Sequence, residues 1–139
     1  MRFFNLEPPD VQQLTLALLE ADRLAQACCD GHLLSGTLQD LPILQQVIDQ
    51  LPTHTLNPQQ VQAIAAALGR VLLHQQEGGD WVIVQGAYQR GFAIRRLGTL
   101  HWISPEGALR SHLHGQAKPN LQRLFASMME RLNPPALAA

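Results

Sequence analysis

Apolar residues recur three and four positions apart in five stretches of the chain, a spacing that predicts five helices. The first begins at Pro8 or Pro9 and ends at Cys28 or Cys29, because proline suits the first helical turn. The other four are expected at about 39–51, 58–77, 105–114 and 119–132. Leu68 holds a central place on the apolar face of the 58–77 helix and is expected to be buried.

The first helix has an apolar face wide enough to predict neighbours on two sides. The stripe expected to be buried consists of Val11, Leu14, Leu18, Ala21, Ala25 and Cys28. It is widened by Leu16, Leu19 and Leu24.

After residue 80 the apolar period changes to two, which predicts strands at about 81–84, 91–97 and 99–104. Their short connections favour an antiparallel meander. Gly98 and Thr99 suit the centre of a type II′ turn, with glycine first. The register that follows pairs Ile94 with Ile103, Arg95 with Trp102, Arg96 with His101 and Leu97 with Leu100. The face that carries Ile94 and Ile103 is expected to meet the core.

The predicted fold is therefore α+β, with three N-terminal helices, a three-stranded antiparallel β-meander and two C-terminal helices. A chain of 139 residues suits one domain, expected at residues 1–133. Residues 134–139 are expected to form a loose tail.

Composition excludes several classes of protein. An apolar content of 46% and a net charge of −1 exclude disorder throughout. No stretch approaches the roughly 18 uninterrupted apolar residues of a membrane span. The two cysteines, Cys28 and Cys29, are adjacent and unsuited to a disulfide framework, and the start lacks a secretory pattern. A cytoplasmic protein is expected.

Charge is distributed unevenly along the chain. Residues 1–80 carry three basic and nine acidic side chains, whereas residues 81–139 carry seven basic and two acidic ones. One interpretation is that acidic helices pack beside a basic sheet within one molecule. Two copies could also form a homodimer by pairing their acidic and basic halves.

The functional interpretation is a basic surface that meets an acidic protein partner. If Arg95 lies opposite Trp102, its guanidinium can stack on the indole, and such a platform has the composition of an interface hot spot. A helix that covers this face would remove the surface. Nucleic acid is less favoured because only Tyr88 and Trp102 could stack on bases. The candidate partner-binding residues are Tyr88, Arg90, Arg95, Trp102 and Arg110.

An enzyme or metal-binding domain built on His101, His112 and His114 is the alternative. His112 and His114 form a close pair, but at a helix end their rings point about 200° apart. No metalloprotease, nucleophile-elbow or phosphate-loop motif occurs, so neither a catalytic residue nor a cofactor or metal ion is expected.

The stretch from Leu41 to Leu113 resembles a family of uncharacterised bacterial single-domain proteins that is known only as a domain of unknown function. The similarity covers half of the chain and consists of Leu68-Gly69, Trp81-Val82 followed by Val84, Tyr88 and Arg90, Pro105 and Arg110. It implies helices followed by a small sheet, and no activity. Acidic residues commonly follow the Trp-Val strand in that family, whereas residues 85–91 of this chain contain none.

Overall fold

A computed structural model describes residues 1–31, 33–51, 56–87, 89–115 and 119–134 of the chain. Residues 135–139 of the expected loose tail lie outside these ranges. None of the helices in the described ranges is long and apolar enough to cross a membrane.

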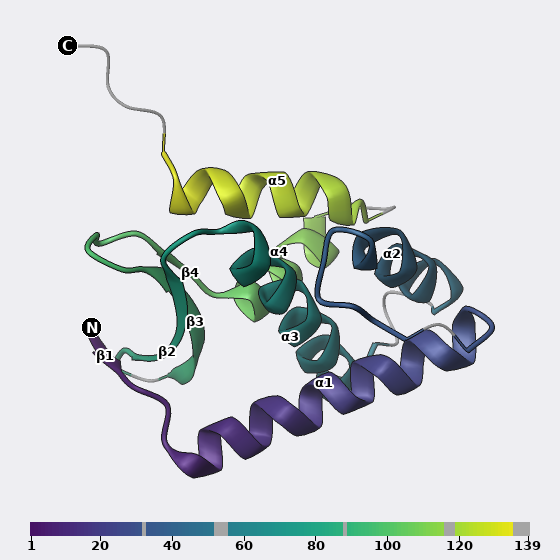
Figure 1. Cartoon of the computed structure of the whole chain (residues 1–139), viewed down its shortest axis with the longest axis horizontal. Helices are drawn as coiled ribbons and strands as arrows, with labels where there is room; N and C mark the ends of the chain where they lie inside the picture. Colours follow the sequence, from purple (N-terminus) through teal and green to yellow (C-terminus); the bar gives the residue numbers. More distant parts are fainter. Residues whose placement is uncertain (32, 52–55, 88, 116–118, 135–139) are drawn as a thin grey trace.

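Helix α3 (Pro58–Gln75) lies at the centre of the molecule (Figure 1). Asn57 and Gln60 cap its start reciprocally, each side chain accepting the other's backbone N–H, at 2.7 and 3.0 Å. Ten of its residues are buried, and Leu68 has no exposed surface, as predicted. The helix is surrounded so completely because its many alanines let neighbouring backbones approach closely.

The four remaining helices all pack against α3. Their bounds agree with the sequence pattern to within about two residues: α1 (Pro8–Cys28), α2 (Asp40–Gln50), α4 (Pro105–Gly115) and α5 (Leu121–Leu132). Helix α1 buries one face only, through residues such as Ala21 and Leu24. Helix α1 contacts both α3 and α2, but the predicted burial of Val11, Leu16 and Leu19 is wrong, since these side chains are 51–59% exposed.

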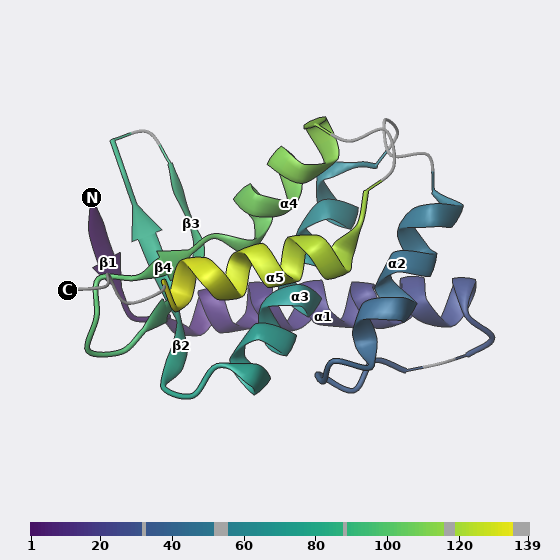
Figure 2. The same ribbon diagram turned by 90° about the horizontal axis from the view of Figure 1, so that it is seen from above.

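The sheet has four antiparallel strands in the order β1-β2-β3-β4. Strands β2 (Gly79–Gln85), β3 (Arg90–Arg96) and β4 (Trp102–Ile103) form the predicted meander, and β1 (Arg2–Phe4) adds an edge strand beside β2. The α+β fold class is confirmed, with one strand more than expected. Three residues are too few to show an alternating pattern, so β1 left no signal in the sequence. The sheet lies at one end of the molecule and the helices extend away from it (Figure 2).

The β3–β4 connection differs from the prediction by one residue. The Thr99 N–H donates to the Arg96 carbonyl at 3.2 Å, so Leu97 and Gly98 occupy the centre of the turn. Gly98 has a φ of +78°, a conformation that glycine adopts without strain. The predicted pairs Ile94–Ile103 and Arg95–Trp102 are nevertheless confirmed.

Strand alternation gives the sheet an inner face and an outer face. Ile83, Ile94 and Ile103 lie on the inner face and are at most 3% exposed, which confirms the predicted core face. Leu97 and Leu100, in the turn, are 59% and 83% exposed.

Trp81 joins the inner face of the sheet to helix α3. A Cβ atom added to Gly69 of α3 would lie 2.2 Å from Cη2 and 2.6 Å from Cζ2 of the Trp81 ring. Such distances are far below van der Waals contact, so the ring can rest on the helix backbone only because residue 69 has no side chain.

Leu68→Ala is expected to lower the free energy of unfolding by about 2–4 kcal/mol, because it removes a fully buried side chain from α3. Chemical denaturation measures the change. A shift below about 0.5 kcal/mol would be too small for a core leucine.

Gly69→Ala is expected to destabilise the protein by about 1–3 kcal/mol through overpacking, although alanine is the better helix former. Gly86→Ala is the matched control, because a Cβ there meets open space. Adding Trp81→Phe removes the clashing ring atoms, so the double variant should be more stable than the sum of the single effects predicts. Strict additivity in denaturant titrations would contradict the contact.

Candidate functional site

Phe3, Arg95 and Trp102 meet on the outer face of the sheet, and we call these three residues the outer cluster. The Arg95 guanidinium carbon lies 4.7 Å from the centre of the Phe3 ring. The Phe3 and Trp102 rings are 5.8 Å apart at an interplanar angle of 74°. The cation–π contact found in the structure is thus made with Phe3, and not with Trp102 as predicted. The unpredicted strand β1 is the reason, since it brings Phe3 to this face.

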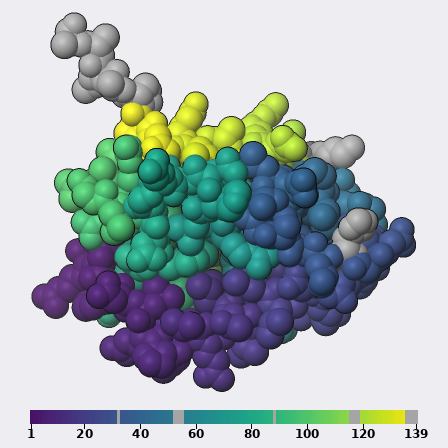
Figure 3. All heavy atoms as spheres, in the orientation of Figure 1, coloured from purple at the N-terminus to yellow at the C-terminus, as the bar shows by residue number. Residues whose placement is uncertain are grey.

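Within the described part of the chain, no helix lies over the outer cluster. In Figures 1 and 2 the five helices lie on the inner side of the sheet or beyond its edge. Figure 3 shows the N-terminal segment directly beside the green β3–β4 region at the same end of the molecule. Small side chains of Val82 and Ala93 lie beneath the cluster, and both are buried. The outer cluster therefore closes a small second layer of packing, and its three residues remain partly exposed.

A groove of about 610 Å³ continues from Trp102 between β4, α4 and α5. Serines from both helices, including Ser111 and Ser127, line it together with Arg131 at one side. Arg95 and Arg131 make no ion pair within the described part of the chain. The groove and the outer cluster together form a surface with cationic and aromatic groups. The groove lining has no carboxylate, and the acidic residue of the outer face beside the cluster is Asp80, the cross-strand neighbour of Arg95.

Arg90 belongs to a different place in the fold. Because side chains alternate along β3, Arg90 lies on the opposite face of the sheet from Arg95. Its two terminal nitrogens bind Asp10 of α1 at 3.0 and 3.1 Å. Asp10 is buried, and its Oδ2 also accepts the Glu7 backbone N–H at the start of α1. The pKa of Asp10 is lower than its ordinary value mainly because Arg90 donates hydrogen bonds to the carboxylate. The backbone N–H of Glu7 lowers it further. The same pairing raises the pKa of Arg90.

The other two predicted partner-binding residues do not join the outer cluster. Arg110 lies on α4, half-exposed, 3.6 Å from Glu106 one turn earlier. Tyr88 lies outside the described residues. The structure thus brings together Arg95 and Trp102, and adds Phe3 and Arg131, which sequence reasoning missed. Strand β1, which carries Phe3, is too short to show an alternating pattern, so no sequence pattern indicated it.

The three histidines of the alternative site have separate environments. His112 accepts the Asn120 backbone N–H on Nε2 at 2.8 Å, and burial is the main cause that lowers its pKa. His101 lies at the β3–β4 turn, and His114 is exposed in the last turn of α4. Over the described residues, no group of three histidine, cysteine or acidic side chains is arranged to hold a metal ion.

The chain thus has the fold of a small α+β protein in which helices cover the inner face of an antiparallel sheet. The chain belongs to the family described as Domain of unknown function (DUF3806), whose sequence model matches residues 40–125. This confirms the resemblance inferred from residues 41–113. Strand β1 and helix α1 precede the matched region.

A crystal structure of a protein from Bacteroides thetaiotaomicron VPI-5482 has a similar fold, with a TM-score of 0.76 at 18% sequence identity. The match covers 93% of this chain and 47% of that protein, so the chain spans about half the length of its neighbour. No curated protein matches the chain.

The pairing of Asp10 with Arg90 predicts a pH-dependent contribution to stability. A carboxyl group whose pKa is lower in the folded state stabilises the protein at pH values above its unfolded pKa. That contribution is lost as the pH falls from the ordinary value of 3.8 through the lower folded value. The stability difference between the wild type and Asp10→Asn should therefore be constant near neutral pH and shrink in acid.

Urea denaturation across this acid range measures the difference. Glu130→Gln is the control, because Glu130 is exposed and makes no ion pair among the described residues. A wild-type advantage over Asp10→Asn that persists unchanged at the lowest pH would show that the ion pair is not its source.

Proposed function

We propose that the protein is a non-enzymatic protein-interaction module that binds an acidic protein segment on the outer cluster and the adjoining groove. The observation that carries the proposal is the outer cluster itself, in which Phe3 contacts the Arg95 guanidinium and meets the Trp102 ring edge to face. Tryptophan, tyrosine and arginine are the residues most enriched at interface hot spots.

The positive charge of this surface favours an acidic partner. Arg95 beside Trp102 and Arg131 along the groove supply guanidinium groups, which suit bidentate contacts with carboxylates. The groove lining contains no acidic side chain that would repel such a partner. An acidic segment that lies along the groove and ends over Trp102 satisfies both features.

The proposed setting is a reducing compartment such as the cytoplasm. Cys28 and Cys29 are both free thiols, and burial is the main cause that raises the pKa of the Cys29 thiol. A buried thiol of raised pKa is poorly reactive, which fits a structural role for Cys29.

The test compares three variants with a matched control. Trp102→Ala is expected to weaken partner binding about 30-fold or more, as for a hot-spot tryptophan. Arg95→Gln and Arg131→Gln each remove one positive charge and should weaken binding up to about tenfold, with the loss reduced at high salt. Arg23→Gln removes the same charge from α1, away from this surface, and should leave binding unchanged.

Affinity capture from the cells that produce the protein identifies the partner, and calorimetry with the purified partner gives each affinity. Thermal melting confirms that each variant is folded. Equal capture by the wild type, Trp102→Ala and Arg131→Gln would remove this surface from the proposal. If the only protein captured is a second copy of the chain, the surface serves a homodimer and the proposal of an acidic partner is wrong.

A further inference from the structure

A second hollow lies on the inner side of the sheet, separate from the outer cluster. It has a volume of about 110 Å³ and is enclosed by α1, α3, β2, β3 and the first turn of α4. Trp81 and Phe92 form one wall, with their rings 6.1 Å apart and nearly perpendicular. The small side chains of Ala17 and Ala66 form the opposite wall and leave the space open.

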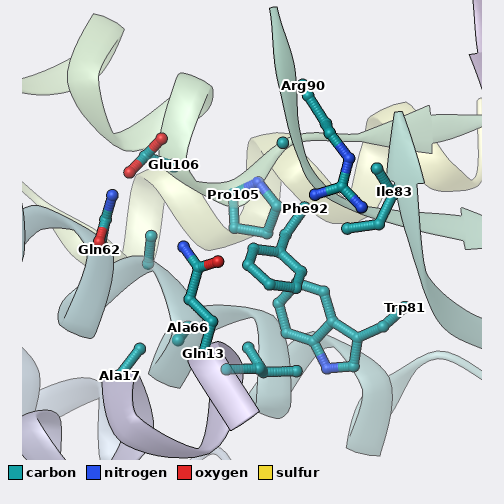
Figure 4. Close-up of a pocket in the computed structure, with 13 residues that line it drawn as sticks. Gln13, Ala17, Gln62, Ala66, Trp81, Ile83, Arg90, Phe92, Pro105 and Glu106 are labelled. Carbon is teal, nitrogen blue, oxygen red and sulfur yellow. The ribbon is translucent and has the colours of Figure 1, made fainter. Parts of the chain in front are cut away.

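Four polar side chains reach this hollow from different elements. Figure 4 shows Glu106 and Gln62 at one end, Arg90 at the other and Gln13 between them. Gln13 and Gln62 are exposed residues at the rim, and their side-chain amides have no hydrogen-bond partner among the described residues. They can therefore orient to donate to a ligand or to accept from it.

Arg90 and Glu106 differ in whether their charged groups have hydrogen-bond partners within the protein. The Arg90 charge is neutralised by two hydrogen bonds to the buried Asp10. Oε1 of Glu106 is shielded from solvent and accepts no hydrogen bond. Its nearest cation is the half-exposed Arg110, whose nitrogen is 3.6 Å away, and a solvent-exposed pair of this kind contributes little. The hollow therefore contains one carboxylate oxygen, Oε1 of Glu106, that accepts no hydrogen bond among the described residues, although the Glu106 side chain is 39% exposed and pairs with Arg110.

We propose that this hollow binds a small organic cation with a short apolar body, carrying an ammonium or guanidinium group. The cationic group donates to Glu106 and to the amide oxygens of Gln13 or Gln62. The apolar body lies against Trp81 and Phe92, and aromatic faces also attract cations. An anion would meet Glu106 with no unpaired cation in the lining to compensate, because Arg90 is already bound to Asp10.

The volume limits the size of the ligand. A cavity volume of roughly 10–15 Å³ already holds one water molecule, so about 110 Å³ admits a short organic ligand. Propylamine has this size, and 1-propanol and propionate are its neutral and anionic counterparts. The three probes thus separate charge from shape.

The experiment titrates the intact protein with each probe and follows the Trp81 indole N–H by NMR. Propylammonium is expected to bind at least tenfold more tightly than 1-propanol, and propionate should give no saturable shift. Glu106→Gln should lower the affinity for propylammonium about tenfold and leave that for 1-propanol unchanged. Glu130→Gln, which removes an exposed acid of α5, should have no effect.

Several results would overturn the proposal. They are the absence of saturable binding by propylammonium, equal or tighter binding of 1-propanol or propionate, and an unchanged affinity in a folded Glu106→Gln variant. If Glu106→Gln does not fold, Ala17→Leu fills the hollow from α1 and should abolish binding of propylammonium, whereas retained binding would place the ligand elsewhere. The wild-type series with the three probes decides the charge preference without any variant.

The cation could be a free amine or the side chain of a polypeptide lysine, and a parallel titration with Nα-acetyl-lysine methylamide distinguishes them. Tighter binding than propylammonium, still dependent on Glu106, identifies a lysine side chain. Weaker binding identifies a free amine, because the attached backbone does not fit at the rim.

Discussion

The contact between Trp81 and Gly69 determines how the sheet sits on the helices. Helix α3 is buried on nearly every side, so any element that packs on it must approach its backbone closely. At Gly69 the indole occupies the space that a side chain would need. Trp81 pairs with Ile94 on β3, and Ile94 pairs with Ile103 on β4, so the position of one ring fixes the inner face of three strands. Both the outer cluster and the inner hollow depend on that placement.

The uneven distribution of charge in the sequence is only partly resolved within the molecule. The Asp10–Arg90 pair joins the acidic N-terminal helix to the basic sheet. Asp40, also acidic and fully buried, is instead satisfied locally by the backbone N–H groups of Ser35 and Gly36, both at 2.7 Å. Its nearest arginine, Arg70, is 3.8 Å away and belongs to the same half of the chain. Internal neutralisation therefore accounts for Arg90 and leaves Arg95 and Arg131 as surface charges.

Sequence reasoning predicted the features that depend on local periodicity and on capping. The five helices, the meander and the Arg95–Trp102 pairing all follow from spacing and turn residues close together in the chain. Sequence reasoning failed where the burial or the contact of a residue depends on a segment that is distant in the chain. Leu16 and Leu19 have the spacing of buried residues, but no neighbour reaches that side of α1. Phe3 contacts Trp102 from a segment far away in the sequence, and a three-residue strand gives no pattern from which to infer this.

The same limit explains why only part of the candidate site was predicted. Arg90 and Arg95 are equivalent in composition, but strand alternation sends them to opposite faces, and a buried carboxylate from α1 then binds one of them. That pairing changes the character of the inner face, because it neutralises the one arginine among the described residues that line the hollow. Arg95, on the outer face, makes no ion pair among the described residues. Strand alternation and one ion pair between the first helix and the third strand thus give the two faces of the sheet different charge environments.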